Sequence, residues 1–169
     1  MSGREPVLVE VEASVSGDMP LAVSIVHNYL PGKAPLMLEE APGLWLITPV
    51  EERIVSYPFP RTPSDFRDLS DLISGEMPHE GVQDFEKLPR FGFTGLATTA
   101  DYLYAGSWNS VYEIRRADLS LSRVITHQLM SDIHGIDVQD DLILTVLTGL
   151  DCVVLTDMDG TIREGFRIE

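Results

Sequence analysis

The chain has 169 residues, 44% of them hydrophobic, and a formal net charge of −15 that arises from 27 acidic and 12 basic residues. That length and hydrophobic content suffice for one globular domain with its own core. The negative charge repels phosphate backbones and argues against nucleic acid as a partner. It leaves divalent cations or basic ligands open, and it is also what keeps an ordinary protein soluble.

Cysteine content and the N-terminal residues bear on the cellular compartment. The single cysteine, Cys152, allows no intramolecular disulfide and gives no sign of an oxidising compartment. Residues 1–14 carry acidic side chains where a secretion signal needs an uninterrupted apolar core, and no segment approaches the roughly 18 apolar residues of a membrane span. We therefore expect a soluble, cytoplasmic protein that does not bind membranes.

The first part of the chain predicts strands. Residues 7–13 alternate apolar and acidic side chains, and Pro20–Leu30 offers a second strand after the turn residues 16–18. Gly43–Phe59 then predicts two strands joined by a turn that contains Pro49. Together these segments read as a first, weakly marked unit of antiparallel strands.

Residues 58–92 form an insertion that is rich in proline and charge. Thr62 and Pro63 suit the cap and the first position of a helix, and apolar residues at helical spacing extend the expected helix over residues 63–74. Residues 76–92 predict an ordered loop that could cover one face of the fold.

Two later segments, Phe93–Ile114 and Ile133–Leu155, are versions of one another. The alignment of Gly95 with Gly135 brings further pairs into register: Leu96 with Ile136, Asp101 with Asp141, Leu103 with Ile143, and Val111 with Cys152 or Val153. An internal period of about 40 residues is typical of a fold built from copied units. Each copy has a turn glycine, short apolar strands and an acidic turn, which is the pattern of a β-propeller blade.

The repeat therefore predicts an all-β fold of propeller-like blades in one domain, residues 1–169, with one short helix in the insertion. The predicted units are residues 7–57, 93–130 and 133–169, with the insertion at 58–92. Closed propellers have four to eight blades, whereas about three fit here. The missing blades could come from self-association, from a longer polypeptide, or from divergent blades near the N-terminus that this count misses.

Two places in the repeat carry candidate functional residues. His134 stands beside the repeat glycine, where the innermost strand of a blade begins near the central channel, and Asp132 and Asp137 flank it. A histidine among carboxylates can bind metal or transfer protons, or it can simply cap a turn. Trp108 and Asn109 lie between two strands of the preceding blade, where tryptophan either stacks on a ligand or wedges neighbouring blades together.

Phe93–Ile114 and Asp132–Gly160 together resemble six-bladed propellers of the gluconolactonase-like and NHL-like group. The resemblance rests on the spacing of glycine, apolar pairs and Asp-Gly turns. It implies a divalent cation, such as calcium, magnesium or zinc, at the mouth of the channel. By position, His134, Asp137 and Asn109 would be its ligands.

A different motif, Val153–Ile162, resembles the first motif of haloacid dehalogenase-like phosphatases, with Asp157 matching the nucleophile and Asp159 the acid/base carboxylate. The downstream serine or threonine and lysine of that family have no place in the eight residues after Thr161. Asp-x-Asp-Gly is also an ordinary hairpin turn or the start of a calcium loop.

Three functions are compatible with these patterns. The first is a propeller that binds a small organic ligand at the channel mouth, with His134 and Asp137 as catalytic groups of a metal-assisted hydrolase or lactonase. The second is a noncatalytic scaffold whose unfinished strands pair with another chain, including a second copy of this one. The third is the phosphatase. Whether the protein is an enzyme stays open at this stage.

Overall fold

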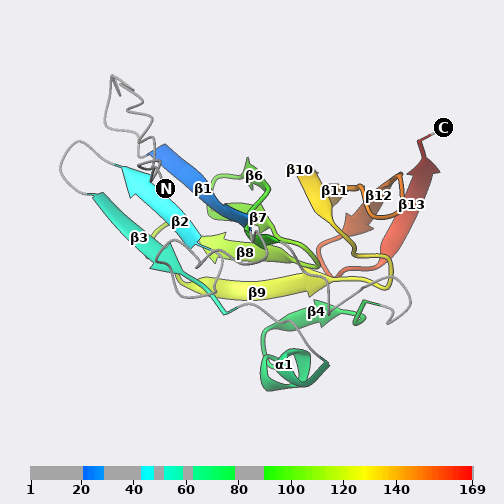
Figure 1. The fold of residues 1–169 in the computed structure, drawn as a ribbon, viewed down its shortest axis with the longest axis horizontal. Coiled ribbons are helices and arrows are strands. Elements are labelled where there is room, and N and C mark those ends of the chain that lie inside the picture. Colours follow the sequence, from blue (N-terminus) through cyan, green and yellow to red (C-terminus); the bar gives the residue numbers. More distant parts are fainter. Residues whose placement is uncertain (1–20, 29–42, 48–51, 59–62, 79–89, 169) are drawn as a thin grey trace, which may run out of the picture.

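A computed structural model describes residues 21–28, 43–47, 52–58, 63–78 and 90–168, and these are mainly β-strand (Figure 1). The elements in chain order are β1 Leu21–Asn28, β2 Gly43–Ile47, β3 Glu52–Ser56, α1 Pro63–Asp68, β4 Ile73–Gly75, β5 Arg90–Gly92, β6 Gly95–Thr98, β7 Tyr102–Gly106, β8 Val111–Arg115, β9 Leu121–Thr126, β10 Ile133–Gln139, β11 Leu142–Leu147, β12 Cys152–Asp157 and β13 Ile162–Arg167. No helix among the described segments is long and apolar enough to cross a membrane.

The strands form three sheets. Their strand orders are β3-β2-β1-β5, β4-β9-β8-β7-β6 and β10-β11-β12-β13. The first and third are antiparallel throughout, whereas β4 joins β9 in parallel. None of these sheets closes on itself within the described residues. The expectation of a fold made mainly of antiparallel strands with one short helix is therefore confirmed.

The sequence repeat corresponds to two copies of a four-stranded meander. Strands β6 to β9 and strands β10 to β13 each run antiparallel to the next, with Gly95 in the first strand of one copy and Gly135 in the first strand of the other. The second and third strands pair through Gly106 and Val111 in the first copy and through Val146 and Val153 in the second. The strand pairing thus makes Val153, rather than Cys152, the counterpart of Val111.

The two meanders lie next to each other through their first strands, because β10 packs against β6 and β7. The backbones approach so closely that a Cβ atom on Gly95 would lie 3.0 Å from the amide nitrogen of Ile136 and 3.2 Å from the Cα of Gly135. Glycine is needed at position 95 for this close approach rather than for a special backbone conformation.

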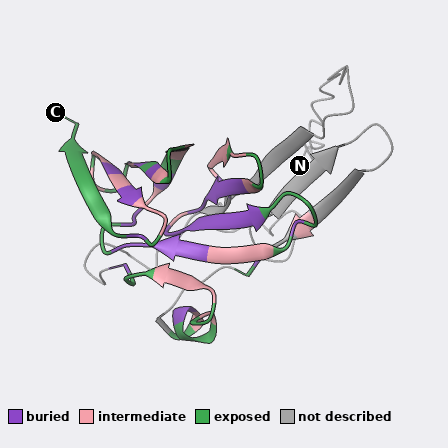
Figure 2. Ribbon diagram, turned by 180° about the vertical axis from the view of Figure 1, so that it is seen from behind, coloured by how far each residue is buried: buried purple, intermediate pink, exposed green. Residues whose placement is uncertain are grey.

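Two hydrophobic clusters fill the spaces on either side of the first meander. One contains Tyr57, Phe93, Tyr112 and Ile114, and in it the ring of Tyr112 meets the rings of Tyr57 and Phe93 edge to face. The other lies between the two meanders and consists of Tyr104, Val111, Ile125, Met130, Ile133, Ile143, Leu147 and Val154. Burial is accordingly greatest in β7, β8 and β9, whereas β13 is exposed along its length (Figure 2).

The insertion differs from its prediction in two ways. The helix ends at Asp68 rather than at residue 74, and Ile73–Gly75 instead forms β4, paired in parallel with Val124–Thr126. Phe66, on the predicted apolar face of the helix, is buried and only 2% exposed. Beyond the helix, however, hydrogen bonds to the edge of β9, including one from the Val124 amide to the Leu72 carbonyl oxygen, replace helical ones.

The N-terminal predictions are confirmed where the structure describes them. β1 lies within the strand predicted at Pro20–Leu30, and β2 and β3 form the predicted hairpin. Residues 7–13 and most of the predicted loop, residues 79–89, lie outside the described residues. The end of that loop is a strand rather than a loop, because β5 pairs antiparallel with β1.

Candidate functional site

His134 occupies a bulge at the start of β10. Ile133 pairs with Leu147 and Gly135 pairs with Val146, so that His134 is the extra residue of its strand. Its side chain is 38% exposed, and its Nε2 lies 3.1 Å from Oδ1 of Asp132. The sequence prediction placed two carboxylates near this histidine, and the structure brings Asp132 into contact with it.

Asp132 is itself held in place by the turn between β11 and β12. Its Oδ2 accepts a hydrogen bond of 2.8 Å from the Thr148 hydroxyl, and its carbonyl oxygen accepts one of 3.1 Å from the Thr148 amide. The backbone of Asp132 has a φ of 51°, which lies in the left-handed region. The carboxylate therefore has a fixed direction and can orient the imidazole for proton transfer.

The other predicted metal ligands lie in different surroundings. Asp137 is exposed, its Oδ1 accepts the Val138 amide at 2.9 Å, and it borders a hollow with Leu144 and Leu155. Asn109 is 0% exposed, and its Oδ1 accepts the Ser110 hydroxyl at 3.0 Å. Within the described residues, no group of three or more His, Cys, Asp or Glu side chains could hold a metal ion.

Trp108 lies in the turn between β7 and β8 and links the two meanders. Its ring is partly buried and packs against the first hydrophobic cluster, while its carbonyl oxygen accepts the Ile133 amide at 3.3 Å. Its buried Nε1 has no hydrogen-bond partner among the described residues. The ring therefore belongs to the hydrophobic cluster that does not lie between the two meanders, and the link to the second meander is the backbone hydrogen bond of Trp108.

Asp157 belongs to the hairpin turn between β12 and β13. Its Oδ1 accepts the amides of Asp159 at 3.0 Å and Thr161 at 2.9 Å, and its Oδ2 accepts Arg163 at 2.6 Å. Gly160 completes the turn with a φ of +80°. Hydrogen bonds from the turn amides and from Arg163 in β13 thus engage both oxygens of the carboxylate that the phosphatase motif would use as nucleophile.

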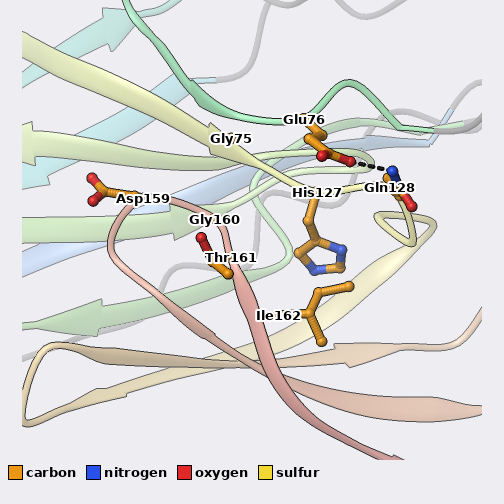
Figure 3. Close-up of a pocket in the computed structure, with 8 residues that line it drawn as sticks. All are labelled: Gly75, Glu76, His127, Gln128, Asp159, Gly160, Thr161 and Ile162. Carbon is orange, nitrogen blue, oxygen red and sulfur yellow. Dashed lines mark hydrogen bonds between the residues drawn. The ribbon is translucent and has the colours of Figure 1, made fainter.

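A cavity of about 270 Å³ lies where this turn meets the ends of β4 and β9 (Figure 3). Its lining residues are Gly75, Glu76, His127, Gln128, Asp159, Gly160, Thr161 and Ile162. Glycine is needed on both sides of the junction: a Cβ atom on Gly75 or Gly160 would lie 2.0 Å or 2.3 Å from the Thr126 carbonyl oxygen. Both glycines also have positive φ.

His127 is the histidine in this cavity that the sequence analysis did not single out. It is 1% exposed, and burial lowers its pKa to about 4, so that the ring is neutral at pH 7. Its Nδ1 accepts the Leu129 amide at 3.1 Å. The sequence signal was its position directly after the strand Leu121–Thr126, but nothing local indicated what would cover it.

The outer face of the last sheet is a further candidate surface, which we call the open face. Cross-strand partners share a face of a sheet, and the pairs Leu144 with Leu155, Val146 with Val153, and Val153 with Phe166 place apolar side chains together. The apolar residues of the open face are Leu142, Leu144, Val146, Val153, Leu155 and Phe166, and by the same pairing Asp137 lies on this face opposite Leu144 and Glu164 opposite Leu155.

The two meanders differ in how far this face of the sheet is exposed to solvent. By strand pairing, Tyr104 and Val111 in the first copy correspond to Leu144 and Val153 in the second. Tyr104 and Val111 are 3% and 0% exposed because the second meander covers them. Leu144 is 37% exposed and Phe166 is 55% exposed. The same face is therefore covered in one copy and uncovered in the other.

Comparison with known proteins adds no assignment: no family model matches the chain, and no curated protein matches its sequence.

Proposed function

We propose that the protein is a β-propeller-type interaction scaffold whose open face binds a further β-sheet of the same kind. The observation that carries this proposal is the contrast between buried Tyr104 and Val111 and their exposed or half-exposed counterparts Leu144 and Val153. A sheet face of apolar side chains is stable only when another layer covers it. In this chain, the layer that covers the equivalent face is another four-stranded meander.

A second copy of this chain is the partner that fits best. The described residues form three sheets, each with four strands in antiparallel order, and β4 is added to the second sheet. Two copies would supply six such sheets, the number in the six-bladed propellers that the sequence resembles. In that arrangement the open face of each copy would contact the β3-β2-β1-β5 sheet of the other, and the two contacts would be related by twofold symmetry.

The mass of the protein in solution tests this proposal. Light scattering coupled to size exclusion should give twice the monomer mass for the unmodified chain. Leu144→Glu places a charge in the open face, where it would be desolvated on association, and should give monomers. Met77→Glu is the matched control, because Met77 is 41% exposed and belongs to a different part of the fold. A monomeric unmodified protein, or a dimer unaffected by Leu144→Glu, would contradict the proposal.

A second candidate function is the binding of a small organic ligand beside His134, with proton transfer to a lactone or related carbonyl compound. The specific support is the pair that His134 Nε2 and Asp132 Oδ1 form at 3.1 Å. A carboxylate that orients an imidazole is the usual arrangement for a general base. The metal-assisted form of this hypothesis has less support, because the described residues bring together no three such donors.

Hydrolysis of a simple lactone such as δ-valerolactone tests this second candidate. Turnover should fall at least tenfold in His134→Ala and in Asp132→Asn if the pair is the base. Metal analysis of the purified protein is a separate measurement: bound calcium, magnesium or zinc that is lost in His134→Ala or Asp137→Ala would support the metal-assisted form. The absence of turnover would leave the scaffold as the sole candidate.

A further inference from the structure

The cavity at the junction of β4, β9 and the β12–β13 turn contains a buried hydrogen-bond donor. Because His127 Nδ1 accepts the Leu129 amide at 3.1 Å, we assign the proton of the neutral ring to Nε2. This Nε2 is buried and has no hydrogen-bond partner among the described residues. A buried donor without an acceptor is costly to the fold, so a molecule that supplies the acceptor has a reason to bind there.

The other lining groups define what such a molecule must offer. Figure 3 shows the Glu76 carboxylate and the Gln128 amide hydrogen-bonded to each other on one side of the cavity, while the imidazole points away from them toward Ile162. Thr161 lies beside Ile162 and brings a hydroxyl group. The Asp159 carboxylate points away from the ring, and its Oδ1 is 3.5 Å from Arg123. The cavity thus combines a donor, a carboxylate acceptor and a hydroxyl.

These groups exclude most ligand classes. An anion would meet the Glu76 carboxylate in a protein whose net charge is −15. An ammonium ion has no acceptor for the proton on His127 Nε2, and an apolar molecule would satisfy neither group. A neutral hydroxylated molecule satisfies both, because each hydroxyl group donates one hydrogen bond and accepts others.

We propose that this cavity binds a small neutral polyol of monosaccharide size. One hydroxyl oxygen accepts the hydrogen bond of His127 Nε2, and other hydroxyl groups donate to Glu76. The volume of about 270 Å³ lies just below the roughly 300–1,000 Å³ of sites for drug-sized molecules. Ile162, which Figure 3 shows beside the imidazole, is 39% exposed, and the proposal requires its side chain to move aside so that the ligand reaches Nε2.

Titration with D-glucose, followed by NMR of the ¹⁵N-labelled protein, tests the site. The Leu129 amide and the ring nitrogens of His127 should show a saturable shift with a millimolar dissociation constant, and the free ring should carry its proton on Nε2. His127→Asn keeps an acceptor for the Leu129 amide but removes the Nε2 donor, and it should weaken binding at least tenfold. Ile168→Ala, at an exposed site that does not line the cavity, is the control and should bind as the unmodified chain does.

Several results would overturn the proposal. These are the absence of a saturable shift in the folded protein, undiminished binding in His127→Asn, a proton on Nδ1, and tighter binding of gluconate or glucosamine than of glucose. If His127→Asn does not fold, Glu76→Gln is the second test, because it replaces an exposed carboxylate at the surface. It should weaken binding severalfold, and unchanged binding in this variant would also overturn the proposal. The site does not depend on the open face, since the solution mass measures that face separately.

Discussion

Replacing His127 with asparagine should flatten the pH dependence of the free energy of unfolding between pH 7 and pH 4. Burial lowers the pKa of His127 from 6.5 to about 4 in the folded chain. Above the unfolded value, neither state binds a proton at this residue. As the pH falls from 6.5 toward 4, the unfolded chain gains a proton that the folded chain does not, and stability is lost. One pKa unit corresponds to about 1.4 kcal/mol, so the loss amounts to about 3 kcal/mol.

Urea unfolding of both chains at pH 7 and pH 4 measures this effect. The quantity to compare is the change in the free energy of unfolding between pH 7 and pH 4 in each chain. The effect of asparagine on packing is the same at both pH values and drops out of this change. The many carboxylates contribute to this difference in both chains and cancel in the comparison. The pH-dependent loss should be about 3 kcal/mol smaller in His127→Asn. An identical pH dependence in the two chains would refute the assignment of a buried, neutral His127.

Two further substitutions test the packing that defines the sites. Gly160→Ala should lower the free energy of unfolding by roughly 1–3 kcal/mol, because a Cβ atom there would lie 2.3 Å from the Thr126 carbonyl oxygen at a φ of +80°. Gly165→Ala is the control and should change stability little, because the nearest atom to a Cβ at Gly165 is 3.9 Å away. Equal losses in the two variants would contradict the close approach at Gly160. Ile143→Ala should lower the free energy of unfolding by about 2–5 kcal/mol, because Ile143 is 0% exposed between the meanders. Ile168→Ala, at a site that is 56% exposed, should lower it far less in the same thermal or urea unfolding measurement.

The sequence was most informative about the repeat. Glycine, apolar pairs and acidic turns recur at a fixed interval because each meander makes the same local turns and the same cross-strand pairs. This is why the alignment of Gly95 with Gly135 correctly predicted equivalent strands. The helix end was less predictable. Residues 69–74 continue a helical apolar pattern, and only the edge of β9, far along the chain, determines that Ile73–Gly75 becomes a strand.

The candidate sites depended even more on distant parts of the chain. The sequence placed His134 near two carboxylates, but the bulge and the Thr148 hydrogen bonds determine that Asp132 is the one in contact with it. His127 could not be singled out, because its burial comes from a turn more than thirty residues later. Local sequence patterns indicate turns and the alternation of strands. The burial of a polar group depends instead on how separate sheets pack against each other.

The parallel strand β4 has a consequence for how the protein behaves when it is concentrated. Exposed strand edges are templates for aggregation, and β4 covers the outer edge of β9. In the described residues, β13 is the outermost strand of its sheet and has no such cover. It carries Arg163, Glu164 and Arg167, all exposed. Charged side chains on an edge strand disfavour pairing with another strand because they would have to give up their hydration, so one sheet is protected by an added strand and the other by charged side chains.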